Sequence, residues 1–493
     1  MSFQRVLAVL ACALSVGVAP AAWAEAAGGA AVQQQLEVLQ TRMQQLEERL
    51  QATNEDLAVA NTRVQAQEEL LKNQTPDVAG GAADFFNRLE IGGWLSGSYW
   101  YNGNDPDNDN LFGANSGFTG CCNPFNPDAN QFSFDQFWLE VEHPVDPENR
   151  AGFRFDIAYG KVAGLLPVGN TPNAGRAGGN NFYIAQAFVQ YLADTALGDV
   201  LIKAGKFGTL LGLEVAQTTG NWNISRSNVY NRLQPIDHVG VLLSGNIDET
   251  WQWALGLVNN VFTTQATRTD GKAITGKVAW SGEKLSAALS GIWGQESGLA
   301  TTTFPNFSAA CIAAGLTADF SACDSGGNED VHIGIIDIIL QYAVNEALTL
   351  ALNGDYVVLD ADGADDPQAW GLAAYANYRW SDRFGTTLRV DLVKDDHDYF
   401  GMVAGQIARA GGGAAFVAPA SGFLDPLHDS TIYSVTLTGD YSVTDNLLVR
   451  GEVRYDNAHI DNYTDDVFVT DGDRLVFGDN DQWLAGAEIV YTF

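Results

Sequence analysis

Charged side chains recur at every second position within several otherwise apolar stretches of the sequence. Arg389 and Asp391 form one such pair, and Arg450, Glu452 and Arg454 form a longer series. If these stretches are β-strands, residues two positions apart share a face, so the charges project together from one side of a sheet. Such a face could bind, orient and steer ions and dipolar solutes without forming covalent bonds.

Four arginines are expected to form a basic wall of this kind: Arg379, Arg389, Arg450 and Arg454. Placed opposite an inward loop, the wall would create a transverse field that orients dipolar or anionic solutes. A second interpretation stays open, in which these arginines only neutralise Asp391 and Glu452 in pairs.

A second group of polar residues lies between 208 and 236, where glycines interrupt the alternation. Glu214, Arg226 and Arg232 lie within this stretch, and Asp237 follows it directly. Its glycines allow sharp turns, so the segment can fold inward and narrow a channel. We therefore expect a constriction in which Glu214 or Asp237 faces basic residues on the wall. The alternative is a loop pinned by structural hydrogen bonds and an internal Glu–Arg pair.

Cysteine and histidine offer little catalytic or metal chemistry. Cys311 and Cys323 share one predicted loop and are expected to form a disulfide, because the chain carries an export signal. The six histidines occur in no Gly-x-Ser-x-Gly or His-Glu-x-x-His setting. We therefore expect no enzymatic activity, no metal site and no cofactor.

The elements that would position these residues are strands, since a period of two runs from Arg88 to Phe493. Sixteen strands are expected, at 88–102, 132–143, 150–161, 182–193, 198–207, 237–247, 251–260, 273–282, 285–296, 331–344, 347–358, 368–380, 383–394, 430–442, 446–457 and 481–493. Short turns and long loops alternate between them, which is the layout of an outer-membrane barrel. A sheet in lipid cannot leave an unpaired edge, so we expect an all-β transmembrane barrel of sixteen antiparallel strands.

Composition agrees with a wet barrel in lipid. The chain has 26 Lys and Arg residues against 60 Asp and Glu residues, a formal net charge of −34, which argues against nucleic acid as a partner. Sixteen strands leave an aqueous channel, whereas eight would be filled by side chains. The expected partners are therefore outer-membrane lipid and small hydrophilic solutes.

The residues before the barrel have a different organisation. Residues 1–24 are expected to be a cleaved signal peptide, and residues 73–87 a linker. Between them, residues 30–72 carry apolar positions at alternating spacings of three and four, which predicts a coiled coil. The narrow apolar seam favours self-association, so we expect a homotrimer with its coil in the periplasm. A helix lying on the barrel's underside is the alternative.

The stretch Ala204 to Val241 contains AGKFGTLLGLE, then NISRSN, then HVGV. This order resembles the OmpL-like β-barrel porin family of the porin-2 type. The resemblance implies an outer-membrane porin of a Gram-negative bacterium that allows passive diffusion of small hydrophilic solutes through a water-filled barrel. Two alternatives stay open: a porin selective for a siderophore or an organic anion, and a structural or adhesive protein tethered through its coil.

Overall fold

The structure is a computed structural model that describes residues 85–103, 130–165, 182–196, 198–262, 271–295, 331–361, 368–396, 429–460 and 481–493. The chain divides into two compact units, Met1–Asn87 and Arg88–Phe493. The expected signal peptide, coiled coil and the cysteines Cys311 and Cys323 lie outside the described residues, as does most of the expected linker. These expectations therefore stay predictions.

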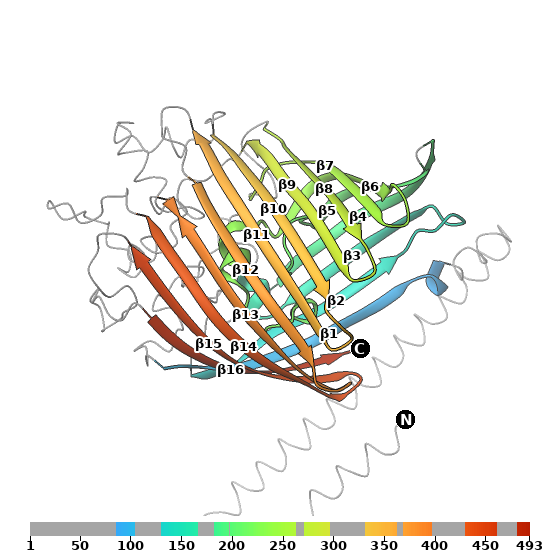
Figure 1. Cartoon of the computed structure of the whole chain (residues 1–493). Helices are drawn as coiled ribbons and strands as arrows, with labels where there is room; N and C mark the ends of the chain where they lie inside the picture. Colours follow the sequence, from blue (N-terminus) through green and yellow to red (C-terminus); the bar gives the residue numbers. More distant parts are fainter. Residues whose placement is uncertain are drawn as a thin grey trace, which may run out of the picture. The chain divides into compact units, whose positions relative to one another are not determined.

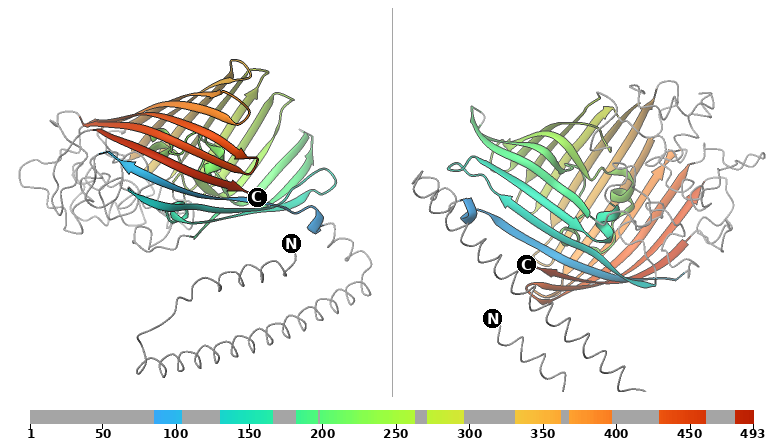
Figure 2. Two further views of the ribbon diagram at one scale, coloured as in Figure 1. Left: turned by 90° about the horizontal axis from the view of Figure 1, so that it is seen from below. Right: turned by 180° about the vertical axis from the view of Figure 1, so that it is seen from behind.

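Sixteen antiparallel strands form a closed barrel in which each strand pairs with its neighbours in the chain (Figures 1 and 2). They are β1 (Glu90–Asn102), β2 (Gln131–His143), β3 (Ala151–Tyr159), β4 (Phe182–Thr195), β5 (Gly198–Gly208), β6 (Asp237–Asn246), β7 (Trp251–Val258), β8 (Ala273–Ser281), β9 (Leu285–Gln295), β10 (Val331–Ala343), β11 (Leu348–Ala361), β12 (Gln368–Arg379), β13 (Phe384–Asp395), β14 (Ser430–Thr444), β15 (Leu447–Ile460) and β16 (Asp481–Thr492). The predicted number, order and antiparallel arrangement of strands are confirmed, with ends that differ by a few residues.

The barrel closes where β1 pairs with β16. Trp94 lies opposite Thr492 and Asn102 opposite Leu484. Beyond the last strand residue, Phe493 donates its backbone N–H to the carbonyl of Gly93 at 2.9 Å. The first and last strands thus satisfy each other's backbone groups, which is the condition for a sheet to exist in hydrocarbon.

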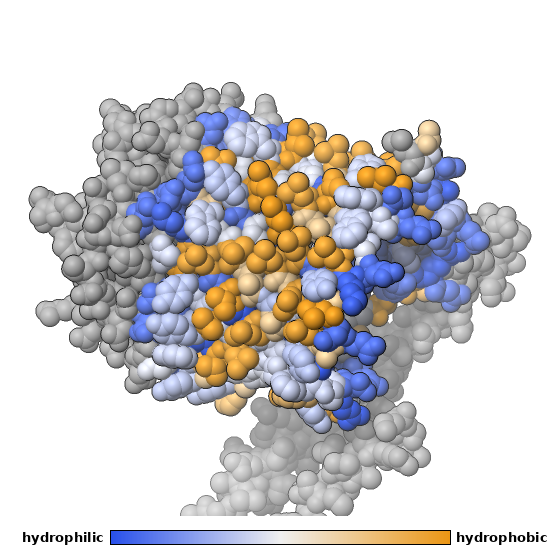
Figure 3. Space-filling model, viewed as in Figure 1, coloured by the Kyte–Doolittle hydropathy of each residue, from blue (hydrophilic) through white to orange (hydrophobic). Residues whose placement is uncertain are grey.

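The outward face of the strands is apolar, as the alternation predicts. On β16, Trp483, Ile489 and Tyr491 are half exposed, whereas Glu488 and Val490 between them are buried. Figure 3 shows a broad band of apolar side chains on one face of the barrel, with hydrophilic side chains toward its ends. An arginine or lysine at the lipid-facing midplane would cost about 2–4 kcal/mol, which explains why the strand charges point inward. None of the helices in the described ranges is both long and apolar enough to cross a membrane.

Short turns occupy the end of the barrel where β16 finishes, and an aspartate closes the turn between β6 and β7. The Asp248 carboxylate accepts hydrogen bonds from the backbone N–H groups of Thr250 and Trp251 at 2.7 and 2.8 Å. These bonds hold the pKa of Asp248 below its usual range, because they stabilise the ionised carboxylate. Side-chain acceptors of this kind fix the turns without a glycine.

Residues 209–236, named here the crossing loop, connect β5 to β6 and fold into the barrel (Figure 2). The loop contains the 3₁₀ turn η1 (Thr218–Gly220) and the helix α5 (Asn228–Leu233). Ser227 caps α5 by accepting a hydrogen bond from the Tyr230 N–H at 3.1 Å. The helix packs against β11 to β14, on the other side of the ring from β5 and β6. The predicted inward fold of this segment is therefore confirmed.

Candidate functional site: the lumen and its crossing loop

The crossing loop is bonded to the far wall of the barrel along most of its length. Asn223 donates from Nδ2 to Thr438 Oγ1 of β14 at 2.6 Å, and Asn228 donates from its backbone N to Asp391 of β13 at 2.9 Å. Gln136 of β2 donates to the carbonyl of Ala216 at 2.9 Å. Because β13 and β14 lie on the other side of the ring from β5 and β6, where the loop begins and ends, the loop spans the lumen.

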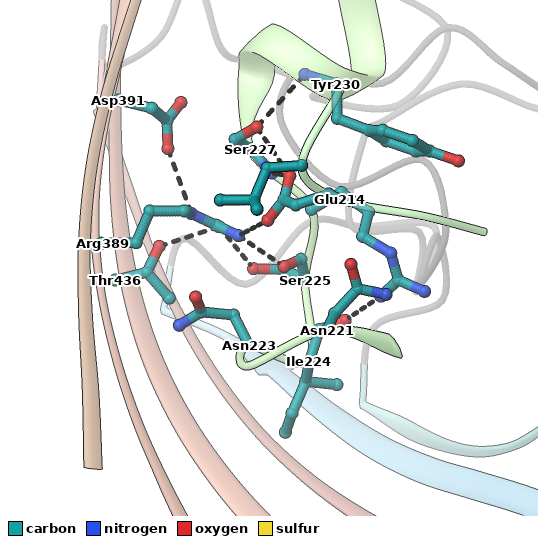
Figure 4. A network of polar contacts seen from close by, with 12 residues as sticks. Glu214, Asn221, Asn223, Ile224, Ser225, Ser227, Tyr230, Arg389, Asp391 and Thr436 are labelled. Carbon is teal, nitrogen blue, oxygen red and sulfur yellow. Dashed lines mark hydrogen bonds and ion pairs between the residues drawn. The ribbon is translucent and has the colours of Figure 1, made fainter. Parts of the chain in front are cut away.

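Arg389 of β13 lies at the centre of a buried polar network (Figure 4). Its Nη1 donates to Glu214 Oε1 at 2.8 Å and to the carbonyl of Ser225 at 2.6 Å, and its Nε lies 3.2 Å from an oxygen of Asp391. A further bond runs from Nη2 to Thr436 Oγ1 at 3.1 Å. The guanidinium is fully buried, so these two carboxylates and the polar oxygens replace the water that the charge has lost.

Glu452 of β15 holds the loop through backbone amides. It accepts hydrogen bonds from the N–H groups of Ile224 and Ser225 at 2.7 and 3.1 Å, and from Thr438 Oγ1 at 2.7 Å. The Ser225 hydroxyl also donates to it. Glu452 therefore binds the backbone of the loop and forms no ion pair with an arginine of the described residues, whereas Asp391 forms an ion pair with Arg389. The pairwise neutralisation considered as an alternative holds for one carboxylate of the two.

Arg450 and Arg454 of β15 complete the contact with the loop. Arg450 pairs with Glu488 of β16 and donates to the carbonyl of Asn221 at 2.9 Å. Arg454 donates to the carbonyl of Arg226 at 2.7 Å and to Asp456 at 2.7 Å. Both guanidinium groups are buried, so they bind the loop and do not face open water.

The loop also organises its own charges. Arg226 donates to the carbonyls of Val215, Ile224 and Ala216 at 2.8, 2.6 and 2.9 Å, all within the loop. The Ser227 N–H and hydroxyl donate to the second oxygen of Glu214, each at 2.7 Å. Glu214 thus joins the loop's own turn to Arg389 on the wall. Arg232 lies in α5 and is half-buried.

The two ends of the loop are held by a buried ion pair at its base. Lys206 Nζ lies 3.2 Å from Asp237 Oδ2, and the Tyr183 hydroxyl donates to the same carboxylate. Lys206 also lies over the Tyr183 ring, 3.9 Å from its centroid. Strict alternation would place Lys206 outward with Ala204, but Gly205 has φ of 136°, a conformation that favours glycine and lets the side chain turn inward.

At the end of the barrel with the long connections, the inner wall is apolar, and α5 packs against the β11 to β14 part of it. Val229 and Leu233 of the helix pack in one cluster with inward-facing side chains of β7, β8 and β10 to β14. The wall residues at that end are Val258, Ala273, Ile333, Val357, Ala369, Val393 and Ile432, each at most 1% exposed. We name this group the apolar layer.

At the end with the short turns, the inner wall is charged and half exposed. Arg154 of β3 pairs with Glu140 at 2.8 Å, with Glu142 at 3.1 Å and with Asp156 at 2.9 Å. Arg379 of β12 pairs with Asp440 on the other side, and its side chain is 36% exposed. We name this end of the lumen the vestibule.

The arrangement differs from the expected wall of four arginines. Arg389, Arg450 and Arg454 are in contact with the crossing loop, and Arg379 lies in the vestibule. The reason is that a charge inside a protein needs partners, and the loop supplies carboxylates, carbonyls and hydroxyls at these three positions. Glu214 does face a basic wall residue, Arg389. Asp237 instead contacts Lys206 and Tyr183, and sequence reasoning missed both of these residues.

No group of three or more His, Cys, Asp or Glu side chains with a metal-binding arrangement occurs in the described ranges. The polar groups of the loop and wall are arranged to bond each other. These bonds hold the crossing loop against the inner wall of the barrel.

A family model described as "Putative beta-barrel porin-2, OmpL-like" matches residues 88–493. No curated protein matches the chain by sequence. Among solved structures, the chain is similar to OmpT of Vibrio cholerae, with 9% identity, a TM-score of 0.49, and coverage of 82% of this chain and 97% of that one. It is also similar to the channel DcaP of Acinetobacter baumannii, with 14% identity, a TM-score of 0.46, and coverage of 82% and 97%. Pseudomonas putida OprB gives 15% identity, a TM-score of 0.46, and coverage of 85% and 97%.

Proposed function

The chain belongs to the OmpL-like β-barrel porin-2 family, and we propose that its crossing loop sets the size limit for solutes that diffuse through the barrel. The protein is an outer-membrane porin, and passive diffusion is the general role of porins. The proposal adds a role for the crossing loop, which limits the size of the solutes that pass, and for the charged vestibule beside it.

The bonding of the loop carries the proposal. A segment fixed at its base by Lys206 and Asp237 and on the far wall by Arg389, Glu452 and Arg450 leaves solutes only the space beside it. The half-exposed Arg154 cluster shows that water reaches the inner wall at the end with the short turns. A rigid partition beside water-accessible charges fits selection by size and charge.

We further propose that the end with short turns faces the periplasm, together with the predicted coil, and that the protein is a homotrimer. Short periplasmic turns and long outer loops are usual for such barrels. The heptad pattern of residues 30–72 supports self-association. A variant that lacks these residues should lose its trimer in light scattering, and an intact trimer would remove this role from the coil.

Planar-bilayer recording and liposome swelling test the function. The refolded protein should give a stable open conductance in threefold steps, and it should pass small sugars faster than larger ones. Heat-denatured protein is the control. A folded barrel that neither conducts nor swells liposomes would instead support a structural role.

A further inference from the structure

Two inward-facing lysines differ from the other basic residues of the barrel wall. Lys203 of β5 lies over the ring of Phe188, with Nζ 4.8 Å from the ring centroid. Lys277 of β8 donates from Nζ to the backbone carbonyl of Leu210 at 3.0 Å. In the part of the chain that the structure describes, neither ammonium group has a carboxylate within 4.0 Å.

The contrast with the neighbouring basic groups is clear. Six other inward-facing strand cations each form an ion pair: Arg154, Lys206, Arg379, Arg389, Arg450 and Arg454. The acids that act on the two lysines from a distance are Glu142 and Asp337, and both are engaged elsewhere. Glu142 bonds Arg154 and Gln190, while Asp337 accepts from Ser290 at 2.7 Å.

Both lysines belong to the half-exposed part of the lumen. Both residues are half-buried, and in the described chain Lys277 forms its hydrogen bond to the crossing loop through the Leu210 carbonyl. In the strand pairing, Lys203 of β5 lies opposite Leu242 of β6, and Leu242 lies opposite Gly256 of β7. Two residues before Gly256 on β7, Ala254 lies opposite Lys277 of β8. Strands are about 4.8 Å apart, so the two ammonium groups stand along roughly 15 Å of wall with uncharged residues between them.

The surroundings of this wall are partly apolar. Leu210 and Leu213 of the crossing loop are half-buried, and the carbonyl of Leu210 is the atom that Lys277 binds. Leu242 and Ala254 line the wall between the lysines. A solute that satisfies both features carries an anionic group for the ammonium and a small apolar body for the leucines.

We infer that Lys203 and Lys277 form an attracting strip for small organic carboxylates inside the barrel. This rests on the proposed porin function and adds the class of solute. The strip counters the acidity of the whole chain, whose net charge of −34 would otherwise repel anions at long range.

The test compares Lys203→Gln, Lys277→Gln and the double variant with Lys284→Gln. Lys284 lies exposed in the turn between β8 and β9 and carries the same charge change outside the strip. Reversal potentials under a KCl gradient give the ratio of chloride to potassium permeability. Liposome uptake of benzoate, measured against neutral arabinose, gives the effect on an organic carboxylate.

We expect the double variant to lower both ratios about fivefold, the change that one unit-charge contact in water produces. Each single variant should give part of this loss, Lys284→Gln none, and the charge-keeping pair Lys203→Arg and Lys277→Arg little. A double variant indistinguishable from Lys284→Gln would overturn the inference while leaving the porin function intact. A wild-type protein without conductance would refute both.

Discussion

Two parts of the lumen, the wall beneath the crossing loop and the vestibule, differ in how their charged side chains are stabilised. Beneath the crossing loop, Arg389, Arg450 and Arg454 have lost their water and depend on partners supplied by the loop and wall. In the vestibule, Arg154 and Arg379 also form ion pairs, but they keep part of their hydration. The same residue type therefore anchors the crossing loop in one part of the lumen and is a partly solvated wall group in the vestibule.

This difference teaches what a charge on the inward face of a strand means. Alternation decides that the side chain points inward, since the outward direction is costly in lipid. Whether it meets water or another segment depends on what else occupies the lumen. The crossing loop decides this here, and we therefore expect the same substitution to have unequal effects beneath the loop and in the vestibule.

The largest contrast is expected between Arg389→Met and Arg379→Met. Removing Arg389 leaves Glu214 and Asp391 buried without their cation, which should lower the free energy of unfolding by about 3–5 kcal/mol. The half-exposed Arg379–Asp440 pair should contribute about 0–1 kcal/mol. Urea unfolding in lipid vesicles, followed by tryptophan fluorescence, measures both. Equal losses would contradict the distinction between the wall beneath the crossing loop and the vestibule.

Leu233→Ala tests how tightly the apolar layer is packed. Leu233 is fully buried in α5, so the cavity should cost about 2–5 kcal/mol in the same assay. Leu213→Ala is the matched control, because Leu213 belongs to the same loop but is only half-buried. A control loss as large as that of Leu233→Ala would mean that Leu233 is no more tightly packed than the half-buried side chains of the loop.

Glu452→Gln and Glu140→Gln compare two glutamates on inward faces. Glu452 binds two backbone N–H groups of the loop, and loss of its charge should cost about 1.5–3 kcal/mol. Glu140 is 32% exposed in the vestibule and should cost about 0–1 kcal/mol. The first variant should also loosen the loop, visible as noisier single-channel current. An unchanged current noise together with an unchanged free energy of unfolding would show that Glu452 does not anchor the loop.

Much of the barrel could be predicted from the sequence, because the period of two and the alternating connection lengths are local features. The faces of Arg389, Arg450 and Glu488 follow directly from them. The contacts of these residues could not be predicted, since Arg389 and Glu214 are 175 positions apart and meet through the path of a loop. The inward position of Lys206 could not be predicted for another reason: the positive φ of Gly205 breaks the alternation at that point.

The segment that resembles the porin family contains more of the residues that hold the crossing loop than its chemistry alone indicated. Lys206, Glu214, Ser225, Arg226 and Ser227 all belong to AGKFGTLLGLE or NISRSN, and all take part in holding the crossing loop. Sequence reasoning placed Glu214 and Arg226 at a constriction. The structure gives both residues partners within the loop or on the wall that holds it.

Replacing residues 210–234 with a short Gly-Ser linker tests the central role of the crossing loop most directly. The readout is the single-channel conductance of the folded barrel, checked by its heat-modifiable migration. A sixteen-stranded barrel without its partition should conduct more and admit larger sugars than the wild type. An unchanged conductance and size limit would contradict the account, because the passage would then be set elsewhere.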